Sequence, residues 1–578
     1  MIRNNGKYAN HHAAIYLRAA AALIVAQLAA CATPDTVPTT IDGSYSAADI
    51  AACRNLILLP TLTITYADVV DRYMGVPAHC YVKGVISNSI NWHAMLPAPD
   101  KWSGRLVHQG DGGSDGNLDA KPDPYTRNWV SLGDVVANSN SGHDIGTGPN
   151  WAYNNRQAEH DFGYRAVHLT VHATKTLTEV YYGRPAEYSY HVGCSNGGRQ
   201  GLAAAQKFPY DFDGIVVGAP SINRARNFYH HLKLMQHLYR DDLAANPAHD
   251  TDGNGLPDSL IKIDRLHNAV LARCDAIDGI VDRIIDDPGS CDFDVGRYLK
   301  ANQCEDGTDN AECYTAAQAA FIRHMYAGSY DDAGKLIYPG LQLGSEHIWY
   351  RFLPQEENQM MSYILQSVIR VFQSVYDEDP GVAPADVSDT SQTVYETGSV
   401  PEWAWWAEDP QRVLTASREL EKIIDATDPD LTRFLVDHGG KLLIYQGWDE
   451  PYHSAGLLLD YYQQVIDKTF DSNPALAQQS VRLFMMPGVQ HCIWGTGPDR
   501  WDRFQVMKDW IEDGKAPDSI TAQHMTWDVP DNERLLCPYP QRAFYVGPEN
   551  GENMAQNWIA DNFECREPDQ APRLAVSE

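Results

Sequence analysis

A serine flanked by glycines is the most reactive-looking feature of the sequence. Ser195 lies in residues 193–197, which fit Gly-x-Ser-x-Gly, and Tyr188, Tyr190 and Val192 before it alternate as in a strand. A strand that turns sharply into a helix exposes such a serine as a nucleophile at the edge of a sheet. Alone, the pattern also fits a plain glycine-rich loop. The rest of the chain must therefore supply a base, an acid and an oxyanion site.

A base and an acid for Ser195 are predicted on its C-terminal side. His491 follows an apolar, strand-like segment that ends at Met486 and is next to Cys492. The acid is expected in the loop that ends the preceding strand, where Asp449 and Glu450 are both candidates. The histidine takes the serine proton, and the acid fixes the histidine tautomer and stabilises its cation.

An oxyanion site is predicted from two backbone N–H groups. A glycine-rich loop, which contains Gly112 and Gly113, follows an apolar strand ahead of the serine. One N–H from Gly112 or Gly113, and one from Asn196 after the nucleophile, could hold the negative oxygen of a tetrahedral intermediate. A tight turn that needs positive φ is the other interpretation of these glycines.

Strand and helix patterns alternate around these residues and predict an α/β fold, with a mostly parallel sheet covered on both faces. The position of the serine makes this an α/β-hydrolase fold. The alternation stops at about Ser221 and resumes at about Gly439 in this chain of 578 residues. We predict a signal peptide at 1–30, a tether at 31–50, a hydrolase domain at 51–221 and 439–578, and an inserted lid domain at 222–438.

The N-terminus has the composition of an export signal. Arg3, Lys7 and Arg18 precede a short apolar run, which ends in residues 28–31, Leu-Ala-Ala-Cys. The run is too short to span a bilayer. Its end resembles a bacterial lipobox, in which Cys31 becomes the lipid-bearing first residue; a plain signal peptidase site is the alternative. We expect a periplasmic, outer-membrane or surface lipoprotein, or otherwise a secreted protein.

The remaining ten cysteines predict disulfides, because the number is even, the chain is exported and no Cys-x-x-Cys pair suggests zinc. The sequence alone does not fix the pairing. Proximity suggests Cys53–Cys80, Cys274–Cys291, Cys304–Cys313 and Cys537–Cys565, which leaves Cys194 and Cys492. A bond between these two would bring Ser195 and His491 together, since it needs Cα atoms within about 7 Å.

Charge excludes two classes of partner. Lysine and arginine number 45 against 76 aspartates and glutamates, for a formal net charge of -31. That field repels nucleic acids and anionic membrane surfaces. We therefore expect no nucleic acid as partner, and a membrane contact only through the lipid anchor.

The sequence resembles the tannase and feruloyl esterase family, whose members include hydrolases of terephthalate monoesters. The resemblance lies in residues 161–168, 193–201, 211–215, 487–492, 514–518 and 537–540. It implies a disulfide beside the triad, in agreement with the Cys194–Cys492 pair. The family acid stands three residues after a glycine, and a gapless match puts Glu450 there, although Asp449 stays possible.

The resemblance also implies a structural calcium site in the predicted lid. The side chains of Asp275, Asp278 and Asp282 and the carbonyls of Ile280 and Ile284 would be the ligands, between Cys274 and Cys291. An acidic solvated turn is the alternative. A second loop at Asp250–Asp258 resembles the start of an EF-hand, but Ile261 replaces the final glutamate, so a second calcium there stays open. Trp403, Trp405 and Trp406 could line an aromatic pocket or pack inside the lid.

Together these features predict a secreted or surface-anchored serine esterase. It would hydrolyse esters of aromatic carboxylic acids, as feruloyl esterases and tannases do, through an acyl-enzyme. A hydrolase of terephthalate monoesters is the nearest alternative. A catalytically silent lipoprotein that binds polyphenols or glycans on the same fold is the alternative from another class.

Overall fold

The computed structural model describes most of the chain. The described residues are 45–72, 75–118, 124–144, 151–152, 155–238, 258–305, 308–351, 353, 409–527, 529–548 and 558–568. The predicted signal peptide, Cys31, the second acidic loop up to Pro257, and Trp403, Trp405 and Trp406 lie outside them. Within the described ranges, no helix has the length and apolar character needed to cross a bilayer.

One nine-stranded sheet organises the molecule. Its order is β1 (Ile64–Val70), β2 (His79–Ile86), β3 (Ile90–Leu96), β5 (Val135–Ser139), β4 (Arg105–Gln109), β6 (Tyr188–Cys194), β7 (Gly214–Gly218), β10 (Lys441–Gly447) and β11 (Val481–Met486). The strands from β5 to β11 are parallel, whereas β1, β2 and β3 add an antiparallel edge. This sheet is that of an α/β-hydrolase fold, as predicted.

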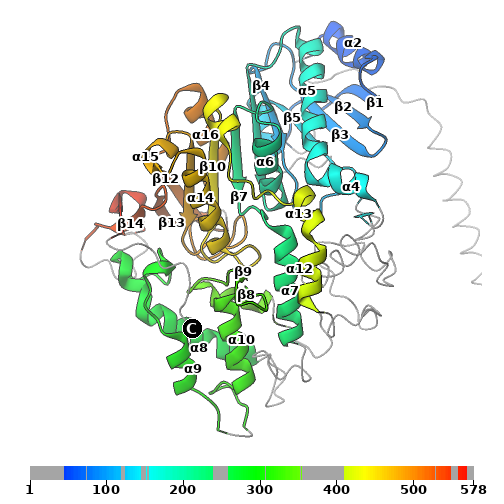
Figure 1. Cartoon of the computed structure of the whole chain (residues 1–578). Coiled ribbons are helices and arrows are strands. Elements are labelled where there is room, and N and C mark those ends of the chain that lie inside the picture. The colour runs from blue at the N-terminus through cyan, green and yellow to red at the C-terminus, as the bar shows by residue number, and fades with distance from the viewer. Residues whose placement is uncertain are drawn as a thin grey trace, which may run out of the picture.

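Helices cover both faces of the parallel part (Figure 1). Helices α5 (Ala166–Tyr182), α6 (Asn196–Lys207) and α14 (Ala455–Thr469) pack on one face, where alternate residues such as Ile215 and Val217 of β7 are buried. Helices α3 (Pro124–Ser131) and α16 (Arg503–Glu512) pack on the other face, against Val216. Strands buried on both faces read as continuous apolar runs, which is why the sequence revealed them.

A large insertion separates β7 from β10. Its elements are α7 (Arg224–Leu238), α8 (Asp258–Cys274), α9 (Val295–Ala301), α10 (Ala316–Ala327), β8 (Ser329–Tyr330), β9 (Leu336–Tyr338), α12 (Pro410–Ala416) and α13 (Arg418–Ile424). They enclose a hydrophobic core of their own around Leu266, Phe321 and Trp349. In Figure 1, α8, α9 and α10 hang below the sheet.

Smaller elements complete the chain at both ends. Helix α2 (Ala47–Asn55) is capped by Ser46, so the last four residues of the predicted tether, 47–50, are helical. The others are α4 (Arg156–His160), α15 (Pro474–Ala477), β12 (Ile520–Thr526), β13 (Val529–Leu536), β14 (Arg542–Tyr545) and β15 (Phe563–Arg566). A π-helical turn at Asp161–Arg165 joins α4 to α5.

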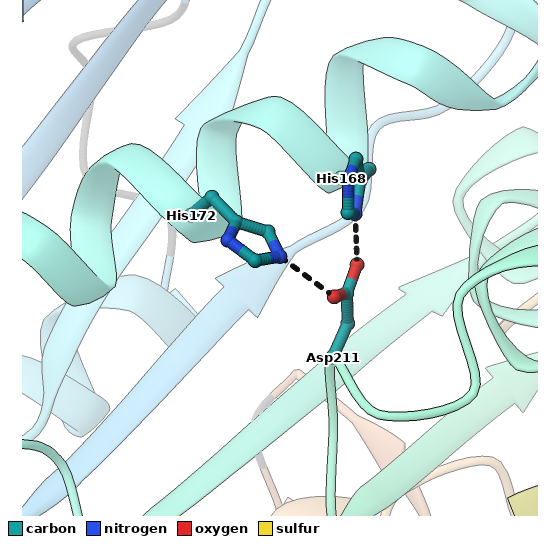
Figure 2. Close-up of side chains that lie close together, drawn as sticks. All are labelled: His168, His172 and Asp211. Atoms are coloured by element: carbon teal, nitrogen blue, oxygen red, sulfur yellow. Dashed lines mark hydrogen bonds and ion pairs between the residues drawn. The ribbon is translucent and has the colours of Figure 1, made fainter.

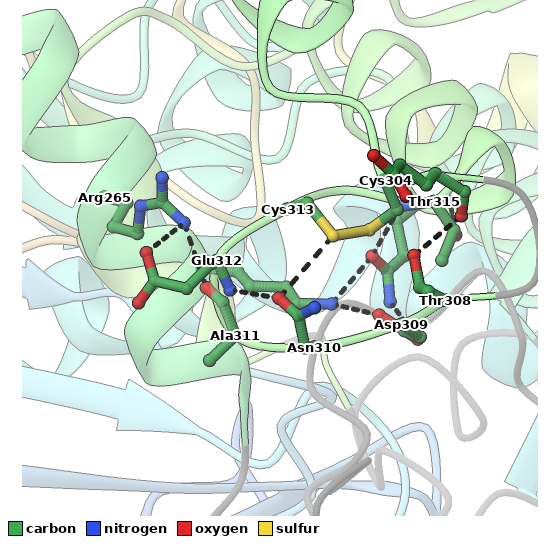
Figure 3. Close-up of a disulfide and its surroundings, with 12 residues drawn as sticks. Arg265, Cys304, Thr308, Asp309, Asn310, Ala311, Glu312, Cys313 and Thr315 are labelled. Carbon is green, nitrogen blue, oxygen red and sulfur yellow. Dashed lines mark hydrogen bonds and ion pairs between the residues drawn. A yellow bond between two sulfur atoms is a disulfide. The ribbon is translucent and has the colours of Figure 1, made fainter.

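Five disulfides are present, and they join the pairs expected from the sequence: Cys53–Cys80, Cys194–Cys492, Cys274–Cys291, Cys304–Cys313 and Cys537–Cys565. Figure 3 shows the shortest of these loops, closed by Cys304 and Cys313 in the insertion. There the carboxylate of Glu312 pairs with Arg265 of α8 at 3.3 Å. This disulfide therefore holds a surface loop against α8, far along the chain from Ser195.

Candidate active site

Ser195 lies at a sharp turn between β6 and α6. Its φ of 61° and ψ of -123° are values that residues with a side chain rarely adopt. The turn is held by backbone hydrogen bonds: the Ser195 N–H donates to the Gly218 carbonyl at 2.9 Å, and the Ser195 carbonyl accepts from Arg199 and Ser221. The strained residue is thus fixed by its neighbours, and this is the geometry of a nucleophile elbow.

Glycines are required around the turn because three backbones touch there. A Cβ at Gly193 would lie 2.5 Å from the carbonyl carbon of Gly197, and one at Gly110 would lie 2.8 Å from the Gly197 Cα. The end of β4, the end of β6 and the first turn of α6 are therefore in direct contact. This contact sets the oxyanion loop after Gly110 beside the elbow.

Glu450 and His491 form the second part of the site. The Nδ1 of His491 lies 2.7 Å from Oε2 of Glu450, and Oε1 of Glu450 accepts from the N–H groups of Tyr452 at 2.7 Å and His453 at 3.2 Å. Because the buried carboxylate can only accept, Nδ1 carries the proton and Nε2 is left as the basic nitrogen. This is the tautomer that a general base for serine needs.

Asp449, the other candidate acid, faces away from His491. Its backbone N–H donates to Val489, and its carboxylate lies 3.6 Å from Nε2 of His347 in the insertion. Burial and then the charge of Glu346 raise the pKa of Asp449 well above its usual range. Of the two candidates, Glu450 alone contacts the histidine. The sequence did not predict this contact of His347, because no motif marks that residue.

The Cys194–Cys492 disulfide ties the two parts together. Its Cα atoms are 5.9 Å apart, and it joins the residue before Ser195 to the residue after His491. Ser195 and His491 both line one cavity of about 870 Å³. Aromatic side chains form much of its wall: Trp129, Tyr445, Trp494, Trp501 and Phe504. The described residues that line it come from the hydrolase part, outside 222–438.

The predicted oxyanion donors are a residue of the cavity wall, Gly112 or Gly113, and Asn196, which directly follows Ser195. Gly112 and Gly113 line the cavity with Ser195, and a Cβ added at Gly112 would meet no atom within 4 Å. Asn196 is the first residue of α6, so its N–H has no acceptor within the helix. The N–H of Asp111 is already donated to Gln200 at 3.2 Å. Gly112 and Asn196 are thus suited to an oxygen bound beside Ser195.

A buried polar network behind the oxyanion loop was missed from the sequence. The carboxylate of Asp115 accepts hydrogen bonds from Gln200 Nε2, at 3.0 Å, and from Ser141 Oγ. Asn138 donates to the carboxylate of Asp111 at 2.7 Å. The loop is thereby tied both to α6 and to the end of β5. The sequence offered one signal, Gln200 inside the glycine-rich motif, but not its partners.

Arg199 ties the start of α6 to neighbouring segments. Its fully buried guanidinium donates to Asn196 Oδ1 and to the backbone carbonyls of Phe162, Gly163 and Ile424. Burial lowers the pKa of Arg199 to about 9. These hydrogen bonds hold the side chain of Asn196, the residue after Ser195, in place.

Two buried histidines lie beneath the elbow. The Nε2–H of His191 donates to the Gly197 carbonyl at 2.8 Å, and its Nδ1 lies 3.2 Å from Nδ1 of His108. These contacts need a neutral His191 ring, whose Nδ1 accepts from the Nδ1–H of His108. Burial lowers the pKa of His191 to about 4. The strand that carries Ser195 therefore rests on groups that acid would charge.

We expect His191→Gln to flatten the acid dependence of stability. Below the ordinary histidine pKa of about 6.5, the unfolded chain binds a proton that the folded chain binds only near pH 4, so stability falls as pH falls through that window. One titrating group changes the free energy of unfolding by up to about 1.4 kcal/mol per pH unit, and the variant should lack this contribution. Urea unfolding at pH 7, 6 and 5 measures it; equal slopes in both proteins would contradict the assignment.

The three predicted aspartates of the acidic loop in the insertion are neighbours along the chain, but their carboxylate oxygens are not all within 4.8 Å of one another. The side chains of Asp275, Asp278 and Asp282 are buried, and the guanidinium of Arg534 lies 2.5 Å from Asp278 and 3.4 Å from Asp282. Ile280 and Ile284 are buried in the same loop. Arg534 comes from β13 and was not foreseen from the sequence.

Comparison with known proteins gives consistent matches over most of the chain. A family model described as tannase and feruloyl esterase matches residues 75–560. A probable feruloyl esterase B-1 from Aspergillus flavus is 30% identical over 485 residues, which cover 80% of this chain and 82% of that protein. A mono(2-hydroxyethyl) terephthalate hydrolase from Piscinibacter sakaiensis is 28% identical over 550 residues, with 85% of each chain covered.

A solved structure agrees with these relatives. The crystal structure of an esterase from Aspergillus oryzae matches with a TM-score of 0.72 at 26% sequence identity, and it covers 89% of this chain and 100% of that one. Most of the chain therefore has a structural counterpart in a protein described as an esterase.

Proposed function

Because the chain belongs to the tannase and feruloyl esterase family, we propose that it hydrolyses esters of aromatic carboxylic acids with Ser195 as the nucleophile. Carboxylic ester hydrolysis is common to its named relatives. The observation that carries the serine mechanism is the contact between His491 Nδ1 and Glu450 at 2.7 Å, on a loop bonded through Cys492 to the residue before Ser195.

In this mechanism Ser195 Oγ attacks the ester carbonyl carbon while His491 Nε2 accepts the hydroxyl proton. Glu450 keeps the proton on Nδ1 and stabilises the imidazolium. The N–H groups of Gly112 and Asn196 hold the oxyanion of the tetrahedral intermediate. His491 then protonates the leaving alcohol, and an acyl-enzyme remains. A water molecule gives its proton to His491, attacks the acyl carbon and releases the acid.

The aromatic wall of the cavity supports an aromatic acyl group. Trp129, Trp501 and Phe504 offer flat apolar surface, on which a cinnamoyl, galloyl or terephthaloyl ring can pack. The match to the Piscinibacter enzyme favours terephthalate monoesters as a second candidate class. We propose in addition that the insertion acts as a lid. In support, Arg224 of α7 donates to the Gly113 carbonyl, and Asn227 donates to the Tyr452 carbonyl beside Glu450.

A substrate panel with a covalent label tests this function. The protein is assayed with methyl ferulate, methyl gallate and mono(2-hydroxyethyl) terephthalate, and then treated with an organophosphate. Turnover of at least one ester, with inactivation by one equivalent of label on the peptide that contains Ser195, is expected. Binding of these aromatic compounds without turnover would instead identify a silent binding protein. Turnover with a label elsewhere would reject Ser195.

We also propose that the loop at 275–284 binds a structural calcium ion. Asp275, Asp278 and Asp282 bring three negative charges into a buried loop, and Arg534 brings one positive charge that it also shares with Asp286. A divalent cation would neutralise the remainder, and carboxylate and carbonyl oxygens are the ligands that calcium prefers. With a rearrangement that draws their carboxylate oxygens closer together, the side chains of the three aspartates would hold it with the carbonyls of Ile280 and Ile284.

Removal of calcium is therefore expected to destabilise the insertion. Dialysis against EGTA should lower the Tm by several degrees, since loss of a ligand that binds only the folded state lowers stability. Calcium, but not magnesium, should restore the Tm. Asp275→Asn should have the lower Tm from the start and respond little to EGTA. If EGTA left the Tm of the wild type unchanged, the calcium site would be rejected.

Finally, we propose that the chain is exported and anchored through a lipid on Cys31. The support is the basic and apolar N-terminus that ends in Leu-Ala-Ala-Cys. Labelling with a fatty-acid analogue in a bacterial host should mark the wild type and not Cys31→Ser. Export without label in the wild type would mean plain signal peptidase cleavage.

A further inference from the structure

We propose that His168, His172 and Asp211 form a binding site for a transition-metal ion of the zinc type. The site lies in the hydrolase domain and is separate from the acidic loop at 275–284. Figure 2 shows both imidazole rings reaching from one face of a helix toward the same carboxylate. Among all histidine, cysteine, aspartate and glutamate side chains in the described part of the chain, these three are the one group of three whose ligand atoms all lie within 4.8 Å of one another, close enough to share an ion.

The backbone sets this geometry. His168 and His172 are four residues apart on α5, so their side chains are neighbours on one helix face. Asp211 lies in the turn between α6 and β7. Its Oδ2 is 2.8 Å from Nδ1 of His168, and its Oδ1 is 3.2 Å from Nε2 of His172.

These distances are close to those of a metal site. Zinc binds histidine nitrogen and carboxylate oxygen at about 2.0–2.2 Å, which places neighbouring ligand atoms of a tetrahedron about 3.3 Å apart. All three ligand atoms here lie within 4.8 Å of one another, so a small movement of one ring would suffice. The set of two imidazoles and one carboxylate suits zinc and its neighbours better than calcium or magnesium.

Two of the three ligands are held in position by other contacts. The Asp211 carbonyl accepts hydrogen bonds from Lys175 Nζ at 2.6 Å and Ser189 Oγ at 2.9 Å, and the Asp211 side chain is buried. The His168 ring stacks on Phe208 with a centroid distance of 3.8 Å. Support of this kind orients ligands before the ion arrives.

The third ligand supplies access. The side chain of His172 is 59% exposed, so an ion can enter from solvent and a water molecule can complete its coordination. Among the described residues, the other histidine–aspartate pairs are not part of a group with a second histidine close enough to share an ion. His524, for example, lies 2.6 Å from Asp531 on the hairpin of β12 and β13, with no second imidazole in its group.

The position of the cluster indicates a structural role for the ion. Asp211 precedes β7, whose far end at Gly218 accepts the N–H of Ser195. The metal would therefore lie at the N-terminal ends of the parallel strands, whereas Ser195 lies at their C-terminal ends. It would clamp α5 to the turn that follows α6, the helix that begins at the elbow.

Zinc binding by the full chain tests the proposal. Protein freed of metal with a chelator is returned to excess calcium and then titrated with Zn²⁺ alone, followed by calorimetry and by the Tm. We expect one zinc equivalent per chain and a Tm rise of about 3 °C or more at saturating zinc. Co²⁺ in place of zinc should give the visible absorption of a four-coordinate ion.

His172→Ala is the decisive variant, because an exposed side chain can be removed without a cavity in the core. It should bind zinc at least about tenfold more weakly and lose the Tm rise and the cobalt spectrum, with ester turnover unchanged. His524→Ala, which breaks a single histidine–aspartate pair, should behave as the wild type. Zinc binding that is equal in the wild type and His172→Ala, or no Tm rise in the wild type, would mean that the two histidines only donate hydrogen bonds to Asp211.

Discussion

Glu450→Gln is expected to lower kcat about 10³- to 10⁴-fold, whereas Asp449→Asn should stay within about tenfold of the wild type. Glu450 accepts through one oxygen from two backbone N–H groups and through the other from His491 Nδ1. A glutamine can keep its carbonyl on the backbone groups only by turning its amide NH₂ toward the histidine. His491 would then carry its proton on Nε2, where it cannot accept the proton of Ser195.

Asp449→Asn is the matched control because the same loop changes by the same chemical step. The raised pKa of Asp449 favours its neutral acid, which an amide resembles in shape and charge. Steady-state kinetics with an aromatic ester, and circular dichroism to check the fold, measure both variants. The opposite ranking would mean that the acid loop rearranges when substrate binds and that Asp449 takes over the role.

The sequence indicated that Ser195 and His491 belong to one site, and the structure places both at one cavity. The turn at Ser195 needs glycine at Gly193 and Gly197, since a Cβ at either position would collide with neighbouring backbone, and that need is visible as a motif. Cys194 and Cys492 were left over after local pairing of the other cysteines, and the structure joins them. The two cysteines thus predicted that segments far apart in the chain lie side by side.

The choice between Asp449 and Glu450 could not be made from local pattern. Adjacent residues in a loop point in different directions, and which one faces His491 depends on the backbone N–H groups of Tyr452 and His453. The comparison with a family pattern favoured Glu450, and the geometry agrees. Asp449 faces His347, more than a hundred residues earlier in the chain.

Other parts of the fold depend on contacts between distant segments, which single-sequence patterns do not encode. The antiparallel edge joins the parallel strands only through the pairing of β3 with β5, and β4 lies between these two in the chain. The network of Gln200, Asp115 and Ser141 joins three separate segments. Arg534 enters the acidic loop from 256 residues further along the chain. Each of these contacts joins segments that the packing of the sheet and helices brings together.

Loss of the Cys194–Cys492 disulfide should impair both catalysis and stability. In the double variant Cys194→Ala/Cys492→Ala, we expect kcat/KM to fall about 100-fold or more, because a shift of about 1 Å between catalytic groups can cost that much. The bond closes a loop with a sequence separation of 298 residues. On the loop-entropy estimate, its removal costs up to about 5–6 kcal/mol.

Cys304→Ala/Cys313→Ala separates the two effects. That bond spans 9 residues on the surface of the insertion, so its loss should cost about 2–3 kcal/mol and leave kcat/KM near the wild-type value. Ester kinetics at a temperature where both variants are folded, together with thermal unfolding, make the comparison. If the first pair lowered Tm but kept full activity, Ser195 and His491 would be aligned by the packing of β6 and β11 alone, and the disulfide would serve stability only.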